Sequence, residues 1–157
     1  MSANSKELEE GQKAPNFSLK SDDGKTYSLS QYKGKEEVLL YFYPRDDTPG
    51  CTKEACSFRD TFPHFSKKGV QVLGVSNDDL DSHAKFRAKY NLNFPLLSDP
   101  DHKVSEEYGV YKEKNNYGNK YWGIERSSFI IDKEGKIKKI FRRVKVDGHT
   151  EEILANL

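Results

Sequence analysis

The sequence predicts an α/β protein in which a mixed central sheet is flanked by helices and preceded by an N-terminal β-hairpin. Two apolar runs of strand length, residues 38–43 and 70–75, indicate buried central strands. Each run is followed by a segment with helical periodicity, and this alternation is typical of strands joined by helices. At 157 residues, the chain fits one domain that can bury about two-thirds of its unfolded surface, so neither a disulfide nor a metal is needed for folding.

The N-terminal part is predicted to contain a lead-in and a hairpin. Residues 1–12 are polar and acidic, and we expect a flexible lead-in to a single domain over residues 13–157. Within residues 14–29, two short extended segments flank Asp22-Asp23-Gly24, which predicts a hairpin with a turn glycine. The lead-in has no signal-like apolar stretch, and no apolar run approaches the ~20 residues of a membrane-spanning helix. We therefore expect a soluble, cytoplasmic protein with no membrane partner.

Two helices are expected after the central strands. The first is predicted to begin at Cys51, with apolar or small residues on one face, at Cys51, Ala55, Phe58, Phe62 and Phe65. Pro63 is expected to kink this helix or divide it into two segments, because proline lacks the N–H that continues the hydrogen-bonded ladder. The second helix is expected to start after residues 76–79, which offer N-cap side chains, and to run to about Tyr90.

The C-terminal half is expected to contain a strand, a helix, a strand–turn–strand unit and a closing helix, at residues 94–97, 99–108, 127–132 with 137–144, and 149–157. Residues 111–123 are polar and aromatic without a period, and we predict a loop there.

Composition excludes several classes of function. The 26 Lys and Arg residues nearly balance the 25 Asp and Glu residues, so the net charge does not indicate a nucleic-acid partner. Two cysteines are too few for a secreted disulfide scaffold. The four histidines are scattered without a close pair, so we expect surface positions, assign them no role, and predict neither a metal site nor a cofactor.

Cys51 lies where a helix start would make a thiol reactive. A free cysteine has a pKa of about 8.5, so little thiolate exists at neutral pH. Unpaired N–H groups and the positive end of the helix dipole favour the thiolate. Gly50 permits a tight turn, Pro49 stiffens the entry to the helix, and Thr48 can donate its hydroxyl toward the sulfur. The alternative is a thiol that only fills space in a core.

Cys56 follows five residues after Cys51. In an unbroken helix, the Cα atoms of positions i and i+5 lie roughly 8–9 Å apart. A disulfide requires roughly 7 Å or less. The two thiols are therefore either unrelated or bond only when the helix opens, and opening one turn near a helix start costs little relative to global unfolding.

The segment from Pro44 to Cys51 resembles the P-x-x-x-T-x-x-C active-site loop of peroxiredoxins. The continuation through Asp60 resembles the bacterioferritin comigratory protein (PrxQ) branch of that family, and the resemblance extends over nearly the whole chain. It implies a thioredoxin-like fold and an antioxidant, thiol-dependent peroxidase that reduces hydrogen peroxide and organic hydroperoxides.

The resemblance also implies roles for individual residues. Cys51 would be the peroxidatic nucleophile and would become a sulfenic acid. Thr48 would hydrogen-bond the sulfur and the peroxide, and Arg126 would stabilise the thiolate and the charge on the departing oxygen. Glu54 would orient an arginine. Pro44 would shield the substrate pocket, to which we also assign the neighbouring residues Pro49, Gly50 and Glu54.

Cys56 would be the resolving cysteine that converts the sulfenic acid into an intramolecular disulfide. Members of the family can carry this cysteine on the next helix instead, but residues 81–85 contain none. Thioredoxin or a similar dithiol would then reduce the disulfide. The family branch suggests a monomer.

Two other functions stay open. A thiol–disulfide oxidoreductase of the thioredoxin kind usually uses C-x-x-C, so the C-x-x-x-x-C spacing argues against it. A peroxide-sensing redox switch would begin with the same sulfenic acid. Comparing insulin reduction with peroxide consumption would distinguish an oxidoreductase from a peroxidase. A partner that binds only the oxidised form would favour the redox switch.

Overall fold

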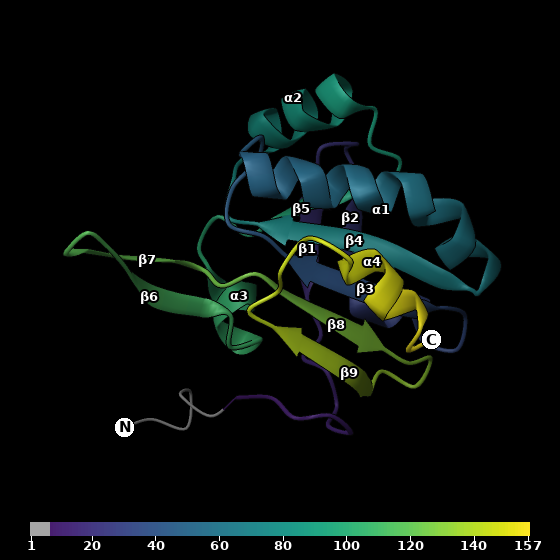
Figure 1. Ribbon diagram of the computed structural model, residues 1–157. Helices are drawn as coiled ribbons and strands as arrows, with labels where there is room; N and C mark the ends of the chain where they lie inside the picture. The colour runs from purple at the N-terminus through teal and green to yellow at the C-terminus, as the bar shows by residue number, and fades with distance from the viewer. Residues whose placement is uncertain (1–6) are drawn as a thin grey trace.

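The computed structural model describes residues 7–157 and consists of a seven-stranded mixed sheet, flanking helices and a separate hairpin (Figure 1). The sheet has the order β2-β1-β5-β4-β3-β8-β9. Its strands are β1 (Ser18–Ser21), β2 (Thr26–Ser28), β3 (Glu37–Phe42), β4 (Val70–Ser76), β5 (Leu96–Ser98), β8 (Ser127–Ile131) and β9 (Ile137–Arg142). The helices are η2 (Leu29–Tyr32, a 3₁₀ turn), α1 (Pro49–Lys67), α2 (Leu80–Tyr90), α3 (Lys103–Glu107) and α4 (His149–Leu154).

The centre of the sheet is formed by three parallel strands. β3 pairs with β4 and β4 with β5, and α1 and α2 make the two crossovers between them. Antiparallel strands then complete both sides, since β8 pairs with β3 and β1 pairs with β5. This is the mixed α/β sheet that the sequence predicts. The N-terminal hairpin, β1 with β2, is confirmed as well.

Alternate residues of β3 serve two hydrophobic cores, because side chains of a strand point to opposite faces. Leu40 and Phe42 pack on the face covered by η2, α3 and the N-terminal segment. Leu39 and Tyr41 face α1, α2 and α4, which Figure 1 shows on one side of the sheet. Because β3 is buried on both faces, its sequence is continuously apolar. Cys51 belongs to the second core.

The prediction of a loop over residues 111–123 is wrong. β6 (Tyr111–Asn116) and β7 (Asn119–Ile124) form a regular antiparallel hairpin, which projects away from the main sheet (Figure 1). Tyr117 and Gly118 connect the strands with φ of 52° and 86°, the left-handed pair expected of a two-residue hairpin turn. Most of its side chains are exposed or half-buried, so its sequence lacks the one-sided apolar alternation of a packed strand.

Pro63 does not divide α1, which continues from Pro49 to Lys67. A proline at this position leaves the carbonyl oxygen of Arg59 without its helical donor. The side chain of Asn93 donates to that oxygen at 3.2 Å, and Phe65, two residues after Pro63, is fully buried. A neighbouring loop thus replaces the missing hydrogen bond.

Other boundaries differ from the expectations by a few residues. α1 begins at Pro49, two residues before Cys51; β5 begins at Leu96; and α3 is limited to Lys103–Glu107. Of the expected lead-in, residues 1–6 lie outside the described residues. Residues 7–12 run beside β9, where Gly11 donates to the carbonyl of Ile137 at 2.7 Å.

Candidate active site

Cys51 lies in the first turn of α1, directly after the loop that leaves β3. Thr48 is the N-cap residue with extended backbone, and Pro49 occupies the first helical turn, where its missing N–H has no intrahelical partner to lose. The Cys51 side chain is 2% exposed. Its sulfur therefore faces the protein interior at the positive end of a helix. Cys51 and Cys56 are both free thiols.

Arg126 brings a guanidinium to this sulfur from the short connection between β7 and β8. Its Nη2 donates to Cys51 Sγ at 3.2 Å, and its Nη1 donates to Glu54 Oε1 at 2.6 Å. Burial opposes the charged guanidinium, yet the charges of Glu54 and Cys51 raise the pKa of Arg126 above its usual value. Arg126 is thus a permanent cation between a carboxyl group and a thiol.

Glu54, one turn after Cys51, is nearly inaccessible, with a side chain that is 2% exposed. Burial raises its pKa to about 7, and the charge and hydrogen bond of Arg126 only partly oppose this rise. Glu54 Oε2 has no hydrogen-bond partner among the described residues. A neutral Glu54 would leave the charge of Arg126 uncompensated beside Cys51.

Gly50 allows Arg126 to approach. A Cβ atom at this position would lie 3.2 Å from Arg126 Nη2, closer than ordinary van der Waals contact. A Cβ here would require the guanidinium to shift by a few tenths of an ångström. The sequence indicated a turn role for Gly50, whereas the structure shows that its lack of a side chain makes room for Arg126.

The hydroxyl of Thr48 donates to the carbonyl oxygen of Arg45 at 3.0 Å. A hydroxyl has one proton, so in this arrangement the Thr48 oxygen is an acceptor for any group that enters the site. Pro44 is half-buried at the start of the same loop, and Pro49 is exposed at its end. Thr48, Pro44, Pro49 and Gly50 therefore belong to one continuous segment around Cys51.

Two aspartates of this loop attach it to α2. Asp46 is buried and accepts hydrogen bonds from Tyr43, Ser82 and His83. Asp47 adopts a left-handed φ of 55° and accepts from Lys89 and Tyr90 near the solvent. The expectation of surface positions for the histidines is wrong for His83 and His149, which are 0% and 2% exposed.

Asp46, Asp78 and His83 are close enough together to hold a metal ion. Their oxygens already accept protein hydrogen bonds: Asp46 through both oxygens, and Asp78 Oδ2 from the Asp46 N–H at 2.8 Å and the Ser76 hydroxyl at 2.7 Å. The cluster thus satisfies itself without an ion.

Lys114 of β6 is a neighbour of the site that the sequence did not indicate. Burial and the charge of Arg126 lower its pKa, while Cys51 acts in the opposite direction. Its aliphatic carbons lie within 3.8 Å of the position that a Cβ of Gly123 would take. The hairpin that we expected to be a loop therefore brings a second cation toward Cys51.

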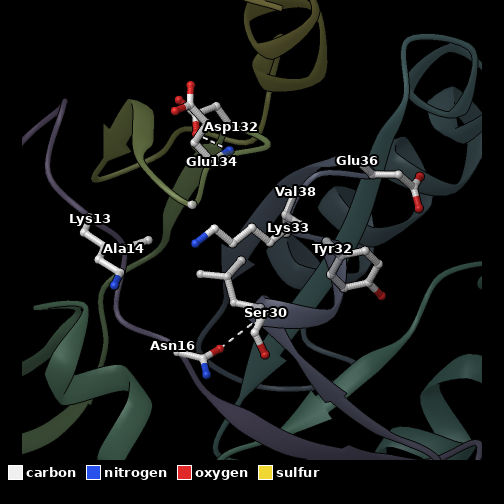
Figure 2. Close-up of a pocket in the computed structure, with 12 residues that line it drawn as sticks. Lys13, Ala14, Asn16, Ser30, Tyr32, Lys33, Glu36, Val38, Asp132 and Glu134 are labelled. Atoms are coloured by element: carbon white, nitrogen blue, oxygen red, sulfur yellow. Dashed lines mark hydrogen bonds between the residues drawn. The ribbon is translucent and has the colours of Figure 1, made fainter.

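A cavity of about 170 Å³ lies elsewhere, against η2 and the turn between β8 and β9 (Figure 2). Ala14, Leu29 and Val38 contribute apolar lining, and Lys33 and Glu134 lie around it. None of the residues predicted for the active site lines this cavity, so it belongs to a different part of the molecule.

Comparison with known proteins identifies the family of the chain. Residues 10–140 match the model of the AhpC/TSA family, and the chain belongs to that family. Within it, the chain is a thiol peroxidase of the peroxiredoxin class, in the Bcp/PrxQ branch that the sequence resembles.

Three relatives illustrate the similarity. A Bcp peroxiredoxin of Coxiella burnetii is 56% identical over 150 residues, which cover 96% of this chain and 99% of the relative. The crystal structure of a Xylella fastidiosa PrxQ mutant aligns with a TM-score of 0.90 at 38% identity, covering 96% of this chain and 95% of that one. The bacterioferritin comigratory protein of Xanthomonas campestris, described for its alkyl peroxide reduction activity, aligns with a TM-score of 0.84 at 41% identity, covering 88% of each chain.

These neighbours confirm the thioredoxin-like fold and the family implied by the sequence. Among the described residues, no helix is both long and apolar enough to span a bilayer.

Proposed function

We propose that this peroxidase reduces hydroperoxides at Cys51, with Arg126, Thr48 and Glu54 forming the polar part of the site. The single observation that carries the proposal is the hydrogen bond of 3.2 Å from Arg126 Nη2 to Cys51 Sγ, made by an arginine 75 residues away in the chain. A guanidinium at that position stabilises a thiolate and, during the reaction, the negative charge on the leaving oxygen.

The first step would form an S–O bond and break the O–O bond. The Cys51 thiolate attacks the terminal oxygen of ROOH, and the electron pair of the O–O bond leaves on RO⁻, which takes up a proton to become ROH. Cys51 is then the sulfenic acid, oxidised by two electrons. While Thr48 donates to the Arg45 carbonyl, its oxygen is free to accept the O–H of the incoming hydroperoxide.

In the second step, Cys56 would attack the Cys51 sulfur and expel water, which leaves a disulfide. Both cysteines lie in the continuous helix α1, and positions i and i+5 are roughly 8–9 Å apart in such a helix. A disulfide therefore requires the first turns of α1 to unwind. In the reduced state the Cys56 side chain is partly accessible, whereas that of Cys51 is buried.

Recycling completes the cycle. We propose that thioredoxin or a similar dithiol reduces the disulfide by thiol–disulfide exchange, as the Bcp/PrxQ relationship suggests. We further propose a monomeric, cytoplasmic enzyme that acts on hydrogen peroxide and organic hydroperoxides. The alkyl peroxide reduction of the Xanthomonas campestris relative supports the second substrate class.

The test combines mass spectrometry with variants. One equivalent of hydrogen peroxide should yield a Cys51–Cys56 disulfide peptide in the wild type and a trapped Cys51 sulfenic acid in Cys56→Ser. Cys51→Ser should consume no peroxide in the presence of a dithiol. Wild-type turnover by Cys51→Ser would overturn the assignment.

A further inference from the structure

His83 is fully buried and binds two hydrogen-bond acceptors at once. Its Nδ1 lies 2.7 Å from Asp46 Oδ2, and its Nε2 lies 2.9 Å from the carbonyl oxygen of Leu97. The carbonyl can only accept, so Nε2 must carry a proton. An ionised Asp46, which already accepts from Tyr43 and Ser82, has no proton to give, so opposite it Nδ1 carries one as well.

A ring with protons on both nitrogens is an imidazolium, and its surroundings favour that charge. Burial opposes it, but the hydrogen bond and charge of Asp46, the Leu97 carbonyl and the charge of Asp78 raise the pKa of His83 above 6.5. The groups that face the ring are Asp46 from the loop after β3, Asp78 from the loop after β4, and Tyr43, whose ring centroid is 6.4 Å away. None of them is a cation.

This ion pair holds the loop that precedes the nucleophile. Asp46 lies two residues before Thr48, and its backbone N–H is fixed separately by Asp78 at 2.8 Å. The loop is thereby joined to α2, to β4 and, through Leu97, to β5. Asp47 adopts a left-handed backbone at the same place, a conformation that aspartate tolerates better than most residues.

We propose that His83 is a positioning residue for peroxide reduction: as an imidazolium it fixes Asp46, and with it the loop that places Thr48 and Cys51 for reaction. When the ring loses a proton, one of its two hydrogen bonds is lost and the loop is released. The inference builds on the proposed role of Cys51 and adds to it a group that never contacts the substrate.

The first measurement is the protonation state of the ring in the reduced, full-length protein. Long-range ¹H–¹⁵N NMR of the His83 imidazole should show both nitrogens protonated at pH 7. A neutral ring with a bare Nδ1 would overturn the proposal. So would a ring whose signals shift on addition of zinc, because that would mean the cluster is a metal site.

The second measurement is the rate constant for Cys51 oxidation by hydrogen peroxide, in single turnover. His83→Gln should lower it about tenfold, since displacements on the order of 1 Å can cost up to a hundredfold. Lys89→Met is the matched control, because it cuts the exposed 2.8 Å pair between the same loop and the same helix. The control should stay within about twofold of the wild type. Equal losses in both variants would overturn the proposal.

The third measurement separates positioning from general stability. In the wild type, the rate constant should fall at the pH where NMR shows His83 losing its proton. Asp46→Asn allows a neutral His83 to accept from the amide, so this variant should fold and lack that fall. A wild-type rate constant that does not change at the pH where His83 loses its proton would refute a role for the charge. So would an Asp46→Asn variant whose rate constant still falls at that pH. Failure of Cys51→Ser to abolish turnover would instead refute the function itself.

Discussion

Replacement of Glu54 by glutamine should remove a pH dependence of folding stability. Burial raises the pKa of Glu54 from 4.5 to about 7. A carboxyl group with a raised pKa in the folded state binds its proton more tightly there than in the unfolded chain, so its contribution is fully present below pH 4.5 and is lost as pH rises through 7. The shift from 4.5 to about 7 corresponds to about 3 kcal/mol.

The measurement is urea unfolding of the reduced protein, followed by circular dichroism at several values between pH 4 and pH 8.5. The free energy of unfolding of the wild type should fall by about 3 kcal/mol relative to that of Glu54→Gln over this range. Parallel curves would show that Glu54 has the same pKa in the folded and unfolded states and would refute the reasoning. The amide of glutamine can still accept from Arg126, so a loss of peroxidase activity in the variant should be modest at pH 6.

The remaining predictions concern the sulfur and its helix. Arg126→Met should lower the rate constant for Cys51 oxidation about 10²–10³-fold, measured by stopped flow, since a charge-stabilising donor is lost; a loss below threefold would contradict this. Gly50→Ala should raise stability by up to about 1 kcal/mol through helix propensity but slow the same reaction, because its Cβ displaces Arg126; unchanged kinetics would mean that the guanidinium need not touch the sulfur. Oxidised wild-type protein should exchange amides faster across residues 52–59 than oxidised Cys56→Ser, and equal exchange would mean that no bridge forms.

The sequence predicts those elements whose environment is uniform along their length. β3 and β4 are buried on both faces and therefore read as apolar runs. β6 and β7 are regular strands, but they are solvated on both sides and show no apolar period. Their one local signal is the turn at Tyr117-Gly118, whose positive φ values suit a short hairpin.

Some features of the site could be predicted from the local sequence and others could not. The environment of Cys51 follows from local chemistry, because proline, glycine and a helix start lie within three residues. The partnership with Arg126 could be expected only through resemblance to a family, since nothing local distinguishes this arginine. The pairing of Asp46 with His83, 37 residues apart, could not be predicted either from local sequence or from the family resemblance. Residue types do not reveal a buried ion pair until the fold brings them together.

The continuity of α1 has a consequence for the electron donor that meets this enzyme. In the reduced state Cys51 is 2% exposed and accepts a hydrogen bond from Arg126, so its sulfur is almost inaccessible to a dithiol. In the proposed cycle, a Cys51–Cys56 bridge would require the first turns of α1 to unwind, and this unwinding would expose the disulfide to the reductant. The oxidised enzyme would therefore differ from the reduced enzyme in the conformation of this segment. A reductant that binds only the unwound segment would donate electrons only to enzyme molecules that carry a disulfide.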